Sequence, residues 1–315
     1  MYNVLVTGGA GFIGSHFIEQ LLADENKYNT IVVLDNLSTG KIENLPVSPK
    51  VKFIKGDVTE PELLKNICID YNFDYIIHLA AVASVQESIE NPEYTHKVNF
   101  DSTLFLLENA RKSIKLKRFI FAGSAAVYGD KPSLPCRESD PVNPLTPYGV
   151  DKYASERYVV NYYKLYKLPT VAFRFFNIYG PRQNPSSPYS GVISIFNKCF
   201  KELNPEVKIF GDGQQCRDFI FVKDLVDILN NSLTNEQMLG NVYNAGTGVE
   251  TTLLDIILSF ERLTGKKAQI NWFKDRPGDI KKSVADINLL SQVCKNKNFY
   301  NIGQGLELLL TTKIN

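Results

Sequence analysis

The sequence comprises 315 residues, of which 44% are apolar, so the chain is large enough and apolar enough to bury a full hydrophobic core. The 35 lysines and arginines nearly balance the 34 aspartates and glutamates, which excludes an overall basic surface for nucleic acid. Because there is no cationic leader and no apolar run of about 18 residues, we expect a soluble, cytoplasmic protein that binds neither nucleic acid nor membrane.

Short β-branched runs alternate with longer helical patterns through the first half of the chain. The strands predicted from these runs are Asn3 to Thr7, Thr30 to Asp35, Val51 to Gly56, Tyr75 to Leu79, Arg118 to Ala122 and Thr170 to Phe173. The intervening segments are long enough for crossover helices, and the runs are continuously apolar, which is typical of parallel strands covered on both faces. The pattern therefore predicts an α/β fold with a doubly wound parallel sheet.

The regular alternation ends near residue 174. A stretch rich in proline, serine and asparagine covers residues 181–190, and shorter, irregularly spaced elements follow it. A helix over Asp224 to Leu233 and a strand over Asn241 to Ala245 resemble the first half again. We predict a nucleotide-binding domain over residues 1–174, with returning segments at about 222–246, and a smaller, mixed α/β substrate lobe over 175–315.

A glycine-rich loop follows the first predicted strand and opens a helical pattern. Its glycines are Gly8, Gly9, Gly11 and Gly14. Such a turn lets the backbone approach a pyrophosphate, and the helix N-terminus offers unpaired N–H groups to the phosphates. Asp35 ends the second predicted strand about 20 residues on, where a carboxylate would accept hydrogen bonds from ribose hydroxyls. The order of strand, glycine loop, helix and acidic residue predicts a Rossmann-type fold. The 2′-phosphate of NADP would be repelled by the Asp35 carboxylate, so we expect the cofactor to be NAD.

Tyr148 and Lys152 stand four residues apart at the start of a long helical pattern, so both side chains should share one face of the helix. A phenol is a poor base because its ordinary pKa is about 10. A nearby ammonium and the positive nicotinamide ring would favour the phenolate and make Tyr148 a proton acceptor. Ser124, after the fifth predicted strand, could bridge the substrate oxygen and the phenol. Chance pairs of tyrosine and lysine are common on helices, but the glycine loop and the serine favour a catalytic triad.

Taken together, these motifs make the sequence similar to the extended short-chain dehydrogenase/reductase family, and within it to the UDP-hexose 4-epimerases. The resemblance runs nearly end to end. The matching segments are Thr7-Gly-Gly-Ala-Gly-Phe-Ile-Gly14, Asp35-Asn36, Gly56-Asp57-Val58, His78-Leu-Ala-Ala81, Asn99, Ser124-Ala-Ala-Val-Tyr-Gly129, Pro147-Tyr-Gly-Val-Asp-Lys152, Arg174-Phe-Phe-Asn-Ile-Tyr-Gly-Pro-Arg182, Cys216-Arg-Asp-Phe219 and Arg276-Pro-Gly-Asp279.

The resemblance implies roles for residues along the whole chain. The NAD-binding residues would be Gly8, Gly11, Phe12, Ile13, Gly14, Asp35, Asn36, Ser38, Thr39, Gly40, Asp57, Val58, Leu79, Ala80, Ala81, Asn99, Tyr148 and Lys152. The residues that bind the nucleotide-sugar would be Ser84, Ser124, Tyr148, Asn177, Val192, Ile209, Arg217, Arg276, Asp279 and Ser283. The two arginines suit a UDP pyrophosphate, because guanidinium groups donate several hydrogen bonds to phosphate. The resemblance also implies a homodimer in which the helix after Asn91 and the helix of Tyr148 form a four-helix bundle.

The residues after Ser124 favour epimerisation over elimination. Relatives that eliminate water or carbon dioxide usually carry an acidic residue there, whereas this chain has Ala125 and Ala126. Removal of a hydride from C4, rotation of the ketone and return of the hydride to the other face then form the simplest chemistry. Gly123 stands where many relatives have serine or alanine, and we expect it to leave extra room.

Two residues indicate which sugar the protein acts on. Ser283 falls where such epimerases differ between tyrosine and a small residue, and Ala83 stands where glucose-restricted relatives can have lysine. Both predict activity on UDP-N-acetylglucosamine (UDP-GlcNAc) and UDP-N-acetylgalactosamine (UDP-GalNAc), with UDP-glucose and UDP-galactose also accepted. The alternative is that Ser283 is an ordinary lobe residue. The three histidines are scattered, and we expect no metal site.

Two other interpretations stay open on the sequence. A 4-ketoreductase acting on a nucleotide-linked 4-keto-6-deoxysugar would use the same triad, but it would exchange its cofactor at every turnover. A non-catalytic dinucleotide sensor would keep the fold for partner binding. Loss of the tyrosine or the lysine is the usual sign of such a sensor, and both residues are present.

Overall fold

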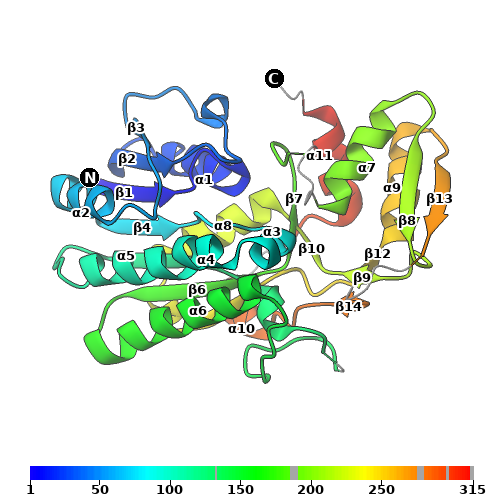
Figure 1. Ribbon diagram of the computed structural model, residues 1–315. Helices are drawn as coiled ribbons and strands as arrows, with labels where there is room; N and C mark the ends of the chain where they lie inside the picture. The colour runs from blue at the N-terminus through cyan, green and yellow to red at the C-terminus, as the bar shows by residue number, and fades with distance from the viewer. Residues whose placement is uncertain (132, 185–190, 275–279, 296–297, 313–315) are drawn as a thin grey trace. The chain divides into compact units, whose positions relative to one another are not determined.

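A seven-stranded sheet forms the centre of the larger of two units in the computed structural model (Figure 1). The structure describes residues 1–131, 133–184, 191–274, 280–295 and 298–312. The strand order is β11-β6-β5-β4-β1-β2-β3, and β3, β2, β1, β4 and β5 pair in parallel. These strands are β1 (Tyr2–Thr7), β2 (Tyr28–Asp35), β3 (Val51–Lys55), β4 (Tyr75–His78), β5 (Arg118–Ser124), β6 (Thr170–Phe175) and β11 (Val242–Ala245). The predicted doubly wound α/β fold is confirmed.

The two faces of this sheet are covered by different helices. The longer elements are α1 (Phe12–Leu22), α2 (Pro61–Tyr71), α3 (Val85–Glu90), α4 (Pro92–His96), η2 (Lys97–Asp101), α5 (Ser102–Ala110), α6 (Pro147–Tyr166) and α8 (Val222–Ser232). Val32 and Leu34 share one buried cluster with α2, α5 and α6. Val33, between them, contacts the region of Gly9 and Ile18, so α1 covers the opposite face because strand side chains alternate.

The six predicted strands of the first half all form, and their ends differ from the predicted ones by no more than two residues. Val4, Leu5 and Val6 are all fully buried, as expected for a strand covered on both sides. The fifth strand extends past Ala122 to Ser124, which places that serine at the carboxyl end of the sheet. In open α/β sheets, ligands bind at this edge.

The smaller unit comprises residues 130–141, 175–225 and 244–315. Its elements are β7 (Asn177–Tyr179), α7 (Val192–Lys201), β8 (Glu206–Phe210), β9 (Cys216–Arg217), β10 (Phe219–Phe221), β12 (Thr251–Thr252), α9 (Leu253–Thr264), β13 (Gln269–Phe273), β14 (Lys282–Ser283), α10 (Asn288–Val293) and α11 (Ile302–Thr311). The strands form small sheets with the orders β10-β7, β12-β9-β14 and β13-β8. A separate apolar core joins α7, α9 and α11, in which Phe200 stacks on Phe260 with 5.0 Å between ring centroids. In the described part of the chain, none of the helices has the length and apolarity needed to cross a bilayer.

Candidate active site

The glycine loop between β1 and α1 is closely packed against its own backbone and against the end of β4. Gly8 has a φ of +69°, and a Cβ there would lie 2.8 Å from the backbone nitrogen of Ala80. A Cβ on Gly14 would lie 2.5 Å from the carbonyl oxygen of Gly8. Gly11, the N-cap of α1, provides no side-chain cap, so the first N–H groups of this helix are left for a ligand. The loop therefore fits a pyrophosphate.

Asp35 ends β2 beside this loop, and its carboxylate is held by two backbone amides. Its Oδ2 accepts a hydrogen bond from Ala10 N at 3.0 Å, and its Oδ1 accepts one from Leu37 N at 2.8 Å. Two donors leave lone pairs of the carboxylate for further hydrogen bonds. Asp35 is thus fixed beside the glycine loop with acceptor capacity to spare, and these residues fit NAD.

Asp57, after β3, provides a second carboxylate at the carboxyl end of the sheet. Asn36 donates a hydrogen bond to Asp57 Oδ2 at 2.8 Å, and Thr59 donates from both its backbone and its hydroxyl to Oδ1. Burial by itself raises the pKa of Asp57, but these hydrogen bonds and one from Tyr94 outweigh it and hold the pKa below its ordinary value. Asp57 is therefore a fixed anion at neutral pH. Gly40 packs against the backbone of Ala10, so residues 38–40 follow the outside of the glycine loop.

A buried polar network lies under the loop. The Thr7 hydroxyl contacts His78 Nδ1 at 2.7 Å and accepts a hydrogen bond from Ala80 N at 3.2 Å. His78 Nε2 contacts the hydroxyls of Thr103 and Ser102. Burial, with a smaller contribution from Lys152, lowers the pKa of His78 to about 3, so the ring is neutral. The network connects the glycine loop, the segment 79–81 and α5.

Asn99 supports the segment 79–82 through both the oxygen and the nitrogen of its side-chain amide. Its Oδ1 accepts a hydrogen bond from Val82 N at 2.9 Å, and its Nδ2 donates to Val82 O at 3.1 Å. The side chain is 1% exposed. Ser155 of α6 donates to Asn99 O at 2.8 Å. Asn99 therefore positions the segment 79–82 and connects it to α6.

The three predicted catalytic residues come together in the larger unit. Thr146 caps α6 by accepting a hydrogen bond from Gly149 N, and Pro147 occupies the first turn, so Tyr148 lies at the very start of the helix. Lys152 is one turn later, and its Nζ donates to Ala122 O of β5 at 2.8 Å. The hydroxyls of Ser124 and Tyr148 are hydrogen-bonded. Tyr148, Ser124 and Lys152 thus lie around the end of β5.

Burial shifts the pKa values of both Tyr148 and Lys152. Burial raises the pKa of Tyr148, and the hydrogen bond from Ser124 only partly offsets this. Burial also lowers the pKa of Lys152 to about 7, although the charge of Asp151 opposes the shift. The protein alone therefore does not favour the phenolate. The positive ring of oxidised NAD, when bound, would supply the missing charge.

An ion pair and a hydrogen bond hold α6 against neighbouring elements. Glu156 and Arg174 form a buried ion pair in which two guanidinium nitrogens each lie 2.7 Å from a carboxylate oxygen. The guanidinium group of Arg174 also lies 4.7 Å from the centre of the Tyr128 ring, in the turn that follows Ser124. His96 Nδ1 of α4 contacts Asp151 Oδ1 at 2.7 Å. Removal of either partner of the buried pair would leave an uncompensated charge in the core.

Gly123 has a different role from the one expected. A Cβ at this position would lie 2.6 Å from the carbonyl oxygen of Phe173 in β6. The space beside Gly123 is therefore filled by backbone. The expectation of extra room for the substrate at Gly123 is wrong, because close approach of two strands requires the missing side chain.

The predicted nucleotide-sugar residues divide between the two units. Ser84 is buried and caps α3 through a hydrogen bond from Glu87 N. In the smaller unit, Arg217 of β9 and Ser283 of β14 are directly paired. Asn177 begins β7 and Val192 begins α7, whereas Ile209 is fully buried in the apolar core of this unit. Arg276 and Asp279 lie outside the described residues.

Several residues to which the sequence argument gave no role support the site. They are Thr7, His78, Glu156 and Arg174, all of which belong to the larger unit. Thr7, His78 and Arg174 do lie inside the quoted motifs, so motif membership was the available signal. Their partners are distant in sequence, and no local pattern indicates which pairs form.

Comparisons with known proteins agree with this geometry. The model of the family described as GDP-mannose 4,6 dehydratase matches residues 5–307. A putative UDP-glucose 4-epimerase of Methanocaldococcus jannaschii is 38% identical over 286 residues, which is 90% of each chain. A UDP-N-acetylglucosamine 4-epimerase from Methanobrevibacter ruminantium, solved with UDP-N-acetylmuramic acid, has a TM-score of 0.91 at 34% identity, covering 98% of this chain and 97% of that one. A Thermus thermophilus UDP-glucose 4-epimerase solved with NAD has a TM-score of 0.85 at 34% identity and the same coverage.

Proposed function

We propose that this chain, which belongs to the extended short-chain dehydrogenase/reductase family, interconverts UDP-GlcNAc and UDP-GalNAc and also accepts UDP-glucose and UDP-galactose. Within the family it is an NAD-dependent nucleotide-sugar 4-epimerase. The single observation that supports 4-epimerisation over elimination is the turn after β5. Ser124 is followed there by Ala125 and Ala126, in the 3₁₀ turn Ala125–Tyr128, so neither position offers a carboxyl group for elimination.

Each residue of the triad has one task. Tyr148, as the phenolate, accepts the proton of the C4 hydroxyl and returns it after the sugar ketone has turned. Ser124 holds the sugar oxygen and the phenol in one hydrogen-bonded chain, and the Lys152 ammonium stabilises the anion of Tyr148. NAD, when bound, would supply the hydride acceptor and donor, and no exchange would be needed because oxidation and reduction cancel.

The purified protein with the NAD it retains provides the test. We expect UDP-GlcNAc, supplied without added cofactor, to yield UDP-GalNAc in NMR spectra. If the protein turned over UDP-glucose but not UDP-GlcNAc, the assignment of an N-acetylated substrate would be contradicted. The assignment as a 4-epimerase would still stand. If product formed only with added NAD(P)H and a nucleotide-linked 4-keto-6-deoxysugar, the protein would be a 4-ketoreductase instead.

The substrate preference depends on Ser283 beside Arg217. A Ser283→Tyr variant is expected to lose activity on UDP-GlcNAc while keeping activity on UDP-glucose, because the bulky ring would fill the space for the acetamido group. Clash of a bulky group in a packed site costs about 1–3 kcal/mol, so kcat/KM for UDP-GlcNAc should fall roughly tenfold to hundredfold. Steady-state rates with both substrates give the ratio. A Ser291→Tyr variant, changed at an exposed position of α10, is the control, and an unchanged ratio in Ser283→Tyr would contradict the assignment.

We also propose a homodimer through the face formed by α4, η2 and α6. A row of rings crosses it, with centroids 5.0 Å apart for His96 and Phe100, 5.3 Å for Phe100 and Tyr158, and 6.3 Å for Tyr158 and Tyr162. On α6, Val150, Tyr158 and Leu165 are 49%, 40% and 70% exposed and share one side of the helix. A large exposed apolar face of this kind is typical of an interface.

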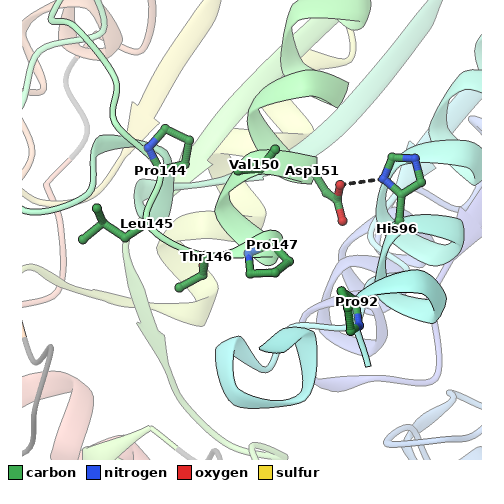
Figure 2. A pocket seen from close by; sticks show the side chains of 8 residues that line it. All are labelled: Pro92, His96, Pro144, Leu145, Thr146, Pro147, Val150 and Asp151. Carbon is green, nitrogen blue, oxygen red and sulfur yellow. Dashed lines mark hydrogen bonds and ion pairs between the residues drawn. The ribbon is translucent and has the colours of Figure 1, made fainter. Parts of the chain in front are cut away.

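The same face contains a hollow of about 450 Å³ at the start of α6 (Figure 2). It is lined by Pro92, His96, Pro144, Leu145, Thr146, Pro147, Val150 and Asp151. Figure 2 shows the His96 ring and the Asp151 carboxylate turned toward each other across it, from α4 and α6. A mostly apolar hollow continuous with the aromatic row can receive side chains of a second copy.

A Leu165→Glu variant is expected to sediment as a monomer, whereas the parent sediments as a dimer. A charge inside an apolar interface would be desolvated without a partner, which is strongly unfavourable. Sedimentation velocity measures both species. Leu203→Glu, at an even more exposed leucine of the smaller unit, should stay dimeric. A monomeric parent would contradict the proposed dimer.

A further inference from the structure

Asp218 is a fully buried carboxylate at the junction between β9 and β10 in the smaller unit. Its carboxylate accepts four hydrogen bonds. Three come from backbone amides, those of Thr247 and Gly248 at 2.8 Å each and Ala285 at 3.1 Å, and one comes from the Thr247 hydroxyl at 2.8 Å. A buried carboxylate is stable only when its oxygens are satisfied in this way.

The backbone of the same residue joins the strands that carry the proposed nucleotide-sugar residues. Asp218 N donates to Ser283 O at 2.9 Å, which continues the pairing of Ser283 with Arg217. Asp218 O accepts hydrogen bonds from the backbone nitrogen of Asn177 at 3.0 Å and from its side-chain Nδ2 at 3.1 Å. The backbone of Asp218 is therefore hydrogen-bonded to Asn177 and to Ser283, and Arg217 precedes it in the chain. The positions of all three residues depend on that of Asp218.

The groups around the Asp218 carboxylate require a hydrogen-bond acceptor at this position. A Cβ on Gly246 would lie 2.7 Å from Asp218 Oδ2, so the loop approaches the oxygen as closely as a residue without a side chain permits. Every neighbour within hydrogen-bonding distance of the carboxylate donates to it. An asparagine here would turn an NH₂ group toward N–H donors, and at least one of them would lose its partner.

We propose that Asp218 is a positioning residue for the nucleotide-sugar, which fixes Arg217, Asn177 and Ser283 relative to one another without touching the substrate. The inference rests on the proposed function, because these three residues matter only if the smaller unit binds the nucleotide-sugar. One buried carboxylate would thus hold together residues that are up to 106 positions apart in the chain, from Asn177 to Ser283.

The test compares Asp218→Asn with Asp224→Asn. Asp224 is a second buried aspartate of the same unit, 1% exposed, which accepts a hydrogen bond from Tyr300 N at 2.9 Å. The measurements are the Kd of UDP by calorimetry, kcat and KM for the UDP-sugar, and the retained NAD. For Asp218→Asn we expect the Kd of UDP and the KM to rise about 10- to 100-fold. We expect kcat to change far less, and NAD content to match the parent. Asp224→Asn should lose a comparable amount of thermal stability with little change in either constant.

Equal effects of the two variants on UDP binding would overturn the inference, because they would indicate general destabilisation of the unit. Unchanged UDP binding in Asp218→Asn would also overturn it. If Asp218→Asn does not fold, Thr247→Val is the second variant. It removes the hydroxyl that donates to Asp218 and accepts from Val249 N, and it should weaken UDP binding about threefold. The control is Thr264→Val, whose hydroxyl donates to Phe260 O instead, and no difference between these two would reject the inference. A parent that does not bind UDP would instead refute the proposed function on which the inference rests.

Discussion

A Tyr148→Phe variant is expected to lose about 10²- to 10⁴-fold in kcat, which is the contribution of a positioned general base. The change deletes a single oxygen, the one hydrogen-bonded to Ser124, and keeps the ring that packs at the start of α6. No other group of the triad can replace it. Lys152 donates to Ala122 O, and Ser124 has no neighbouring carboxylate or imidazole at positions 125 and 126 to activate it. Epimerisation rates by NMR, on whichever UDP-hexose pair the parent turns over, provide the measurement.

The matched control is Tyr153→Phe, which removes a phenolic oxygen from the next tyrosine of the same helix. It should keep kcat within about twofold of the parent, because Tyr153 is half-buried and is not part of the triad. Both variants should retain as much NAD as the parent, because the glycine loop and Asp35 are untouched. A Tyr148→Phe enzyme that turns over near the parent rate would show that another group removes the proton.

Substitution of Gly14 by alanine is expected to weaken NAD binding roughly tenfold to hundredfold, because overpacking of a rigid site costs about 1–3 kcal/mol. The new Cβ would lie 2.5 Å from Gly8 O and 2.6 Å from Gly9 Cα, and both are backbone atoms of the loop. Backbone atoms can make room only if the loop opens. The expected result is therefore a protein purified with little NAD, which is measured by quantifying released cofactor and by calorimetry on the stripped enzyme.

Gly303→Ala makes the same substitution in another helix, and we expect it to stabilise the fold instead of disrupting local packing. A Cβ at Gly303 in α11 would approach only Asn301 Oδ1, at an ordinary 3.4 Å. Alanine should then stabilise the fold by about 0.5–1 kcal/mol, because glycine loses more conformational freedom on folding. Full NAD retention in Gly14→Ala would mean that the loop has room that its backbone geometry denies.

The sequence by itself determined the features that depend on neighbours along the chain. Continuous apolar runs identified the strands, because a strand buried on both faces must be apolar throughout. The spacing of the glycines after β1 identified the turn before α1, and Asp35 at the end of β2 indicated the ribose contact. The spacing of Tyr148 and Lys152 placed both on one face of α6, because the helix repeat fixes that geometry before any tertiary contact forms.

Only the tertiary structure decided the features in which distant segments meet. Gly123 was read as spare volume, but the Phe173 carbonyl occupies the space, 50 residues further along the chain. Burial, which no motif reports, raises the pKa of Tyr148 and is larger than the effect of Ser124. Asp218 reads as one more acidic residue until Thr247 and Ala285 are seen to donate to it. Sequence patterns encode local conformation and the alternation of faces, whereas desolvation and hydrogen-bond partners depend on which strands become neighbours, and folding alone establishes that.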